Sequence, residues 1–161
     1  MVKVAEKFFI RPASTDEAEL LSDLALRSKA HWGYSQEFLE VCRRELTLTP
    51  DYISTSPVFV LEEEKRVVGF YGLRARGDEV ELLYLFIEPS AMNHGYGRQL
   101  WNHAVETAVR LGFQRISIES DPYAEAFYQA MGALTIKFVS SSVKAERKLP
   151  ILEFPLNQSL S

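Results

Sequence analysis

The 161-residue sequence has little cysteine and no long apolar run. The lone Cys42 cannot form an intramolecular disulfide or a cysteine-built metal site, so we expect it to be a core residue on an apolar helix face. No window approaches about 18 uninterrupted apolar residues, and the N-terminus lacks a long apolar stretch followed by a cleavage site. These absences predict a cytoplasmic protein that is neither exported nor membrane-spanning.

Excess positive charge and metal-ligand patterns are missing as well. With a formal net charge of -4, the chain has no global positive field for nucleic acid or an anionic membrane, and we expect neither as a partner. No grouping of His, Cys, Asp or Glu has the spacing of a metal site, and no Gly-x-Ser-x-Gly elbow occurs. We therefore expect no metal and no covalent enzyme intermediate.

The composition is that of a folded protein, and the length suits one core, so residues 1–161 are predicted to form a single domain. Helical and extended signals alternate along the chain, which predicts an α/β (α+β) layer architecture. Strands are expected at residues 8–10, 58–61, 67–73, 80–87, 115–119, 134–139 and 149–156, with a polar hairpin turn at 62–66. Helices are expected from near residue 15, after Ser35 with an end before Pro50, over 100–111 with Gly112 as the exit, and from Asp121 to Gly132.

The run Met-Asn-His-Gly-Tyr-Gly-Arg at residues 92–98 lies between an apolar strand and an amphipathic helix. Unpaired backbone N–H groups at a helix N-terminus can hold an anion. Gly95 and Gly97 let a phosphate approach the main chain, so a pyrophosphate is the natural guest. A plain structural turn is the alternative. A dinucleotide is disfavoured because no Gly-x-Gly-x-x-Gly turn with a later acidic partner is present.

With these residues the sequence resembles the GCN5-related N-acetyltransferase (GNAT) superfamily, whose cofactor motif is Gln or Arg, two residues, Gly, one residue, then Gly or Ala. Residues 121–133 resemble the family's second motif, which is Asn or Asp, then Ala, Phe-Tyr and a closing Gly-Phe. The resemblance is specific from about residue 80 to residue 133. It implies a mixed, mostly antiparallel sheet of six to seven strands, about four flanking helices, and a splayed strand pair for the cofactor.

The resemblance also implies acetyl-CoA as co-substrate and assigns residues to it. The strand before the loop offers main-chain groups to the pantetheine arm, and the loop backbone holds the pyrophosphate. The implied cofactor-binding residues are Leu85, Phe86, Ile87, Asn93, His94, Gly95, Tyr96, Gly97, Arg98, Asp121, Ala124, Phe127 and Tyr128. The strand can also be a buried core strand, and both roles can hold together, while Arg98 can equally be a solvated helix residue.

Three positions depart from the family pattern. Met92 replaces the usual Gln or Arg, which removes one polar side chain but leaves the N–H groups of the loop intact. Asp121 stands where Asn is common, and Ala133 stands where Phe is usual. None of these changes removes a feature on which the resemblance depends.

Transfer of an acetyl group from a thioester to an amine needs a proton donor near the departing sulfur and a group that takes the amine's proton. By the resemblance Tyr128 is the donor, whereas its helical spacing alone favours a core residue. Glu81 aligns with the glutamate base of the histone acetyltransferase branch, although it can instead be an exposed edge residue. Glu79, Glu88 and Glu119 remain alternatives, and a water chain can replace any base.

The acceptor side is less defined. Trp32, Tyr34 and Phe38 lie between two predicted helices, where the family recognises its amine, and we expect them to bind substrate, with hydrophobic packing as the alternative. Of the histidines, His94 is expected to line the phosphate loop and His103 to lie on the outer helix face.

The leading hypothesis is acetylation of a primary amine on a small molecule, with a protein or peptide amine as the second choice. A non-catalytic acyl-CoA-binding sensor is a different class, which Tyr128 disfavours because a pure binder needs no phenol at the sulfur. A homodimer is an expectation from the family only.

Overall fold

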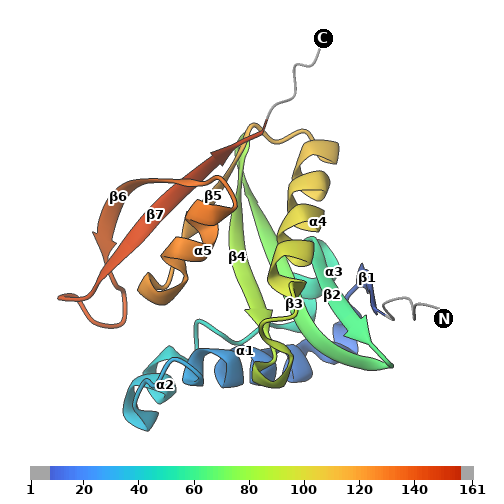
Figure 1. Cartoon of the computed structure of the whole chain (residues 1–161), viewed down its shortest axis with the longest axis horizontal. Coiled ribbons are helices and arrows are strands. Elements are labelled where there is room, and N and C mark those ends of the chain that lie inside the picture. The colour runs from blue at the N-terminus through green and yellow to red at the C-terminus, as the bar shows by residue number, and fades with distance from the viewer. Residues whose placement is uncertain (1–7, 157–161) are drawn as a thin grey trace, which may run out of the picture.

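Seven strands form one mixed sheet in the computed structural model, which describes residues 8–156 (Figure 1). Their order across the sheet is β1-β2-β3-β4-β5-β7-β6, and all neighbours are antiparallel except β4 and β5. The strands are β1 (Phe8–Pro12), β2 (Val58–Glu63), β3 (Arg66–Arg76), β4 (Glu79–Ile87), β5 (Arg115–Glu119), β6 (Leu134–Ser140) and β7 (Lys148–Pro155). The α-helices are α1 (Ala18–Ala30), α2 (Gln36–Cys42), α3 (Pro50–Thr55), α4 (Tyr96–Arg110) and α5 (Glu125–Ala130), with 3-10 turns η1 (Thr15–Glu17), η2 (Pro89–Ala91) and η3 (Pro122–Ala124). The predicted fold class is confirmed.

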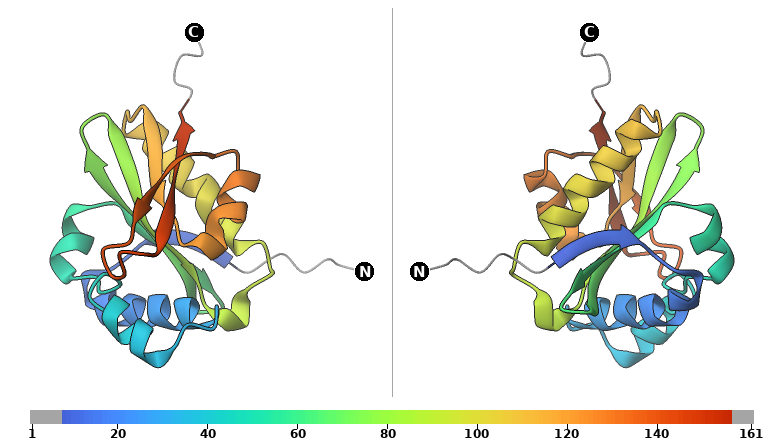
Figure 2. Two further views of the ribbon diagram at one scale, coloured as in Figure 1. Left: turned by 90° about the vertical axis from the view of Figure 1, so that its left-hand side faces the viewer. Right: turned by 90° about the vertical axis from the view of Figure 1, so that its right-hand side faces the viewer.

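Helices cover both faces of this sheet. Helices α1, α2 and α3 pack on one face, and α4 and α5 pack on the other (Figure 2). Because side chains alternate along a strand, β2 and β3 contribute side chains to the cores on both faces of the sheet. Val60 and Phe70 belong to the core under α1, while Leu61 and Tyr71 belong to the core under α4.

Most predicted elements lie where the sequence placed them. The amphipathic pattern of α4 buries Leu100, Trp101 and Ala104 against the sheet. The charged run at residues 62–66 is the predicted hairpin turn, with Glu64 and Lys65 in the left-handed region at φ 50° and 68°. Helix α2 begins after Ser35, whose hydroxyl accepts a hydrogen bond from the Phe38 N–H at 3.0 Å.

Helix α3 was not predicted, so the chain has five α-helices in its described part rather than about four. The hydroxyl of Thr49 caps this helix by accepting from the Tyr52 N–H at 3.1 Å, and Pro50 occupies its first turn. In the sequence, Pro50 was interpreted only as the limit before which the preceding helix ends. A proline that ends one helix also suits the first turn of the next.

Candidate active site

Strands β4 and β5 separate from each other along most of their length. They pair only from Glu79 with Arg115 to Glu81 with Ser117. Beyond that point β4 carries a bulge, because Gly72 of β3 faces Tyr84 while the next residue faces Leu82. A bulge bends its strand, and it accounts for the opening that follows on the β5 side.

The bulge also determines which main-chain groups of β4 face this opening. The Glu88 N–H donates to the Val68 carbonyl at 2.7 Å, which fixes the side of β4 that faces β3. Main-chain groups alternate along a strand, so those of Leu85 and Ile87 face the unpaired side. These are two of the three residues to which the family resemblance assigns the pantetheine arm.

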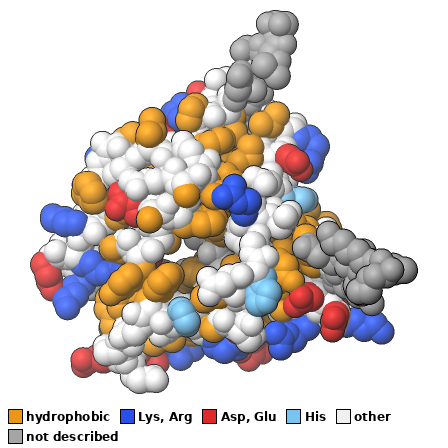
Figure 3. All heavy atoms as spheres, in the orientation of Figure 1, with side chains coloured by type: hydrophobic (Ala, Val, Ile, Leu, Met, Phe, Trp, Pro, Cys, Tyr) orange, Lys and Arg blue, Asp and Glu red, His pale blue; other side chains and the backbone are white. Residues whose placement is uncertain are grey.

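A cleft of about 1050 Å³ occupies this opening and continues between the helical layer of α1 and α2 and the β6–β7 loop. Figure 3 shows the surface hollowed in this region. Most of the predicted cofactor residues line it, namely Leu85, Phe86, Ile87, Asn93, Gly95, Tyr96, Gly97, Arg98, Asp121, Ala124, Phe127 and Tyr128. His94 does not line it.

The loop before α4 ends in a cap that suits an anion. Gly95 is the N-cap with φ 80°, and Asn93 has φ 67°, a left-handed conformation that asparagine tolerates. The first bond of the helix runs from the Gln99 N–H to the Gly95 carbonyl at 3.2 Å. The N–H groups of Gly97 and Arg98 therefore have no acceptor within the helix, and both residues line the cleft.

Two side chains of this loop are held by other residues, and a third is not. The Tyr96 hydroxyl donates to Glu63, and the ring packs on Phe8, so this side chain anchors the loop. The Nδ1 of His94 lies 3.0 and 2.9 Å from the carbonyl oxygens of Ala91 and Met92 and donates to them. Arg98 is exposed, and no residue in the described part of the chain holds its guanidinium by a hydrogen bond or ion pair.

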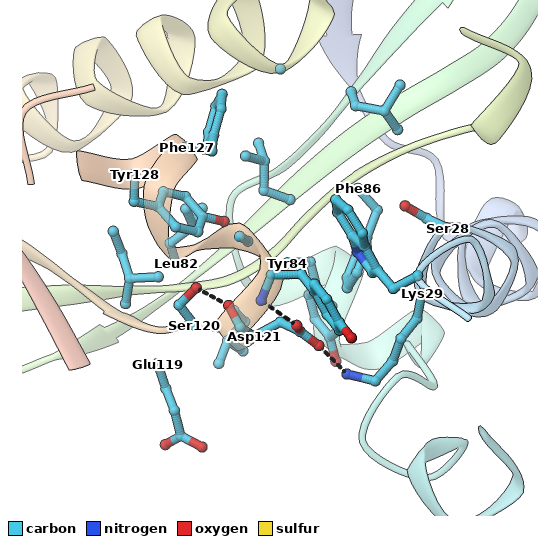
Figure 4. A pocket seen from close by; sticks show the side chains of 18 of the residues that line it. Ser28, Lys29, Leu82, Tyr84, Phe86, Glu119, Ser120, Asp121, Phe127 and Tyr128 are labelled. Carbon is cyan, nitrogen blue, oxygen red and sulfur yellow. Dashed lines mark hydrogen bonds and ion pairs between the residues drawn. The ribbon is translucent and has the colours of Figure 1, made fainter. Parts of the chain in front are cut away.

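Helix α5 brings Tyr128 to the cleft (Figure 4). The residue is only 6% exposed, and its hydroxyl has no hydrogen-bond partner among residues 8–156. Within those residues no fully buried side-chain polar atom lacks a partner, so the hydroxyl is open to the cleft. Burial raises the pKa of Tyr128, which keeps the phenol protonated at neutral pH.

Asp121 is placed in the same cleft but faces other side chains. Its carboxylate accepts from Lys29 at 3.0 Å, Tyr34 at 2.9 Å and Arg147 at 3.2 Å, and it caps η3 through the Tyr123 N–H at 2.8 Å. Burial alone would raise the pKa of Asp121, but the charge of Lys29 and these hydrogen bonds outweigh it and lower the pKa. Asp121 is therefore ionised at neutral pH.

Two glutamates project from the face of the sheet opposite α4. Glu81 of β4 and Glu119 of β5 both line the cleft. The carboxylate oxygens of Glu81 accept from Arg74 at 2.9 Å and Arg76 at 3.0 Å. Glu119 has no hydrogen-bond or ion-pair partner among the described side chains, and its pKa is raised by burial and by the charges of Glu45 and Glu81. Tyr128 and Glu119 lie on opposite sides of the end of β5 (Figure 4).

The other glutamates considered as bases lie in ion pairs outside the cleft lining. Glu79 accepts from Arg115 at 3.1 Å, and Glu88 forms a two-point pair with Arg27 at 2.7 and 2.8 Å. Hydrogen bonds from Arg27 lower the pKa of Glu88. Neither glutamate borders the cleft.

The three aromatic residues predicted to bind substrate fall into two groups. Trp32 lines the cleft, is 40% exposed and stacks on Tyr123 with ring centroids 5.2 Å apart. Tyr34 and Phe38 do not line it. The centroids of their rings are 4.8 Å apart, and Phe38 also packs on the core under α1. For Phe38 this agrees with hydrophobic packing, the alternative stated from the sequence.

The expected position of His103 on the outer helix face is wrong. It does not lie on the outer face of α4, because its Nδ1 is 2.7 Å from the Tyr71 hydroxyl and its ring packs on Phe59. Burial lowers the pKa of His103, so the neutral imidazole is favoured. Cys42 is buried as predicted and is a free thiol.

Some cleft residues were not foreseen at all. Lys29 and Arg147 border the cleft and converge on Asp121. Each has other charged or polar residues beside it in the sequence, so neither charge stands out, and most charged residues are solvated. Over residues 8–156 no group of three or more His, Cys, Asp or Glu side chains is placed to hold a metal, and no helix of that part is long and apolar enough to cross a bilayer.

Comparison with known proteins agrees with this geometry. Residues 21–133, more than half of the chain, match the family described as Acetyltransferase (GNAT) family. No curated protein matches the sequence at a significant level.

Solved structures share the fold at low identity. The PaiA N-acetyltransferase from Thermoplasma acidophilum in complex with coenzyme A is 20% identical with a TM-score of 0.76, over 92% of this chain and 98% of that one. A GCN5-related N-acetyltransferase from Rhodopseudomonas palustris is 17% identical with a TM-score of 0.77, over 97% and 99%. The ribosomal-protein-S18-alanine N-acetyltransferase from Escherichia coli is 15% identical with a TM-score of 0.69, over 96% and 99%. The family match and the shared fold together show that this chain belongs to the acetyltransferase (GNAT) family.

Proposed function

We propose that this chain is an acetyl-CoA-dependent N-acetyltransferase that moves an acetyl group to the primary amine of a small molecule, by direct attack and without a covalent enzyme intermediate. The observation that carries the proposal is a single cleft lined by both the N-terminus of α4 and the hydroxyl of Tyr128. The first suits a diphosphate, and the second suits a departing sulfur. Coenzyme A bound to the PaiA neighbour supports the choice of coenzyme.

The residues of the cleft fit the parts of such a coenzyme. The N–H groups of Gly97 and Arg98, with the free Arg98 guanidinium, suit the diphosphate. The outward-facing main-chain groups of Leu85 and Ile87 suit the amides of a pantetheine arm. A Cβ at Gly97 would lie 3.3 Å from the ring of Phe127, so this glycine keeps the start of α4 close to α5. When bound, the coenzyme supplies the acetyl thioester.

Proton transfer is assigned to two sides of the cleft. The Tyr128 hydroxyl is protonated at neutral pH, has no internal partner and donates its proton to the sulfur. On the opposite face of the sheet, Glu81 or Glu119 takes the proton of the attacking amine, directly or through water. The structure favours Glu119, because protonating Glu81 would weaken its ion pairs with Arg74 and Arg76.

A small acceptor fits better than a protein segment. The acceptor side of the cleft lies between the α1–α2 region and the β6–β7 loop, and these two segments contact each other. Tyr34 accepts from Arg147 of the loop, and the Ser142 hydroxyl donates to Glu45. An extended peptide has no open path between two segments that are joined in this way.

Two measurements on the purified protein test the proposal. Acetyl-CoA at about 100 times its Kd should stabilise the native state by about 2.7 kcal/mol and raise the Tm. A panel of small primary amines, followed by thiol release, should then identify a turned-over acceptor. Absence of a Tm shift at large excess would contradict the coenzyme assignment, and turnover of peptides alone would contradict the small-molecule assignment.

A further inference from the structure

One carboxylate joins three segments that are far apart in the sequence. Lys29 at the end of α1, Tyr34 in the α1–α2 loop and Arg147 in the β6–β7 loop all donate to Asp121, the N-cap of η3, at 3.0, 2.9 and 3.2 Å. The side chains of Lys29, Asp121 and Arg147 are 14%, 16% and 17% exposed. Interactions at this depth are screened less by solvent than a surface ion pair.

The network leaves Asp121 little capacity for a ligand. Its Oδ1 accepts from the Tyr123 N–H and from the Tyr34 hydroxyl, and its Oδ2 accepts from Lys29, Tyr34 and Arg147. Burial and the charge of Asp121 raise the pKa of Tyr34 to about 12, so the phenol stays protonated as a donor. The carboxylate acts on other side chains rather than on the contents of the cleft.

Aromatic rings extend the network over the rim of the cleft. The Arg147 guanidinium lies 5.2 Å from the Tyr34 ring centroid and 5.1 Å from that of Phe38, and Lys29 lies 5.2 Å from that of Tyr34. Trp32, three residues after Lys29, stacks on the ring of Tyr123 with an interplanar angle of 4°. Besides Asp121 itself, four residues of this assembly border the cleft, namely Lys29, Trp32, Tyr123 and Arg147.

The assembly lies on the acceptor side of the cleft, away from the start of α4. Its segments are the helical layer and the β6–β7 loop, which bound the face of the sheet that carries Glu81 and Glu119. Figure 4 shows Lys29 reaching Asp121 from α1, across the cleft from Phe127. Loss of the network would therefore loosen the walls that surround an acceptor and leave the phosphate loop in place.

We infer that Asp121 is a positioning residue that holds the acceptor side of the cleft closed through Lys29, Tyr34 and Arg147, so that affinity for the amine depends on it and affinity for the coenzyme does not. The inference rests on the proposed acetyl transfer. It takes Asp121 out of the predicted coenzyme-binding set.

Asp121→Asn is the decisive variant because an asparagine oxygen can still accept from the Tyr123 N–H and cap η3. We expect the KM for the amine to rise about tenfold or more, with kcat within about threefold and the KM for acetyl-CoA within about twofold of wild type. Arg147→Met should have a similar effect, and the two effects should not add in the double variant. Glu125→Gln is the control, since this carboxylate lies in the same segment but bonds to Thr135 outside the cleft.

Two outcomes would overturn the inference. One is an unchanged KM for the amine in Asp121→Asn. The other is an equal rise in the KM values for amine and acetyl-CoA, which would return Asp121 to the coenzyme site.

Hydrogen exchange provides a readout that needs no turnover. In Asp121→Asn, residues 31–38 and 141–147 should lose protection together, whereas Glu125→Gln should leave both unchanged. Unchanged protection in Asp121→Asn would also overturn the inference. If wild type neither binds acetyl-CoA nor acetylates an amine, the proposed function fails, and the exchange result still decides whether Asp121 joins these segments.

Discussion

Removal of the Tyr128 hydroxyl should lower kcat and leave the stability of the fold almost unchanged. A general acid contributes about 10²–10⁴-fold to a rate, so Tyr128→Phe should lower kcat about 100-fold, equivalent to about 2.7 kcal/mol in the barrier. The hydroxyl has no partner in the described part of the chain, so its loss leaves no buried group unsatisfied. The free energy of unfolding should change by less than about 1 kcal/mol.

Tyr52→Phe is the matched control, with the opposite expectation. The Tyr52 hydroxyl donates to the Leu73 carbonyl at 2.8 Å, and the residue lies outside the cleft lining. Its loss leaves a carbonyl of β3 without that donor, which should cost about 1–3 kcal/mol of stability and leave kcat unchanged.

Thiol release at saturating amine and acetyl-CoA gives kcat for both variants, and urea unfolding gives their stabilities. Titration calorimetry should show the same acetyl-CoA affinity for Tyr128→Phe as for wild type. An unaltered kcat in Tyr128→Phe would remove Tyr128 from the mechanism. A large loss of stability in the same variant would show that the hydroxyl has a structural partner and would refute the reasoning from burial.

Two further predictions concern the base and the buried histidine. Glu119→Gln should lower kcat about tenfold or more and flatten the acid side of its pH profile, while Glu81→Gln should have the smaller effect on kcat; the reverse order would assign the base to Glu81. His103 has a lowered pKa in the fold, so its contribution to stability is complete above about pH 6.5 and is lost as the pH falls through the folded pKa. The Tm of wild type should therefore fall between about pH 7.5 and 5, and His103→Gln should show a smaller fall; equal slopes would contradict this.

Local signals in the sequence predicted the elements of one half of the cleft, at the start of α4, whereas the binding of a coenzyme there stays a prediction. The loop at residues 92–98, the amphipathic α4 and the Asp-Pro start of η3 each depend on neighbours within a few residues. Residues that line this half are therefore close in sequence as well as in space. The separation of β4 from β5 was implied only by the family resemblance, because the bulge at Leu83 has no distinct sequence pattern.

The other half of the cleft, between α1 and the β6–β7 loop, could not be predicted in the same way. Lys29 and Asp121 are 92 residues apart, and Tyr34 and Arg147 are 113 apart. Contacts at such separations follow from how the sheet and helical layers pack, and periodicity does not report them. His103 was misplaced for a related reason, because its partner Tyr71 lies on β3, 32 residues away.

The most direct test of the account is a crystal structure of the chain with coenzyme A. It should show the diphosphate against the N–H groups of Gly97 and Arg98, and the sulfur within hydrogen-bond reach of the Tyr128 hydroxyl. A diphosphate bound elsewhere, or a sulfur remote from Tyr128, would contradict the central claim.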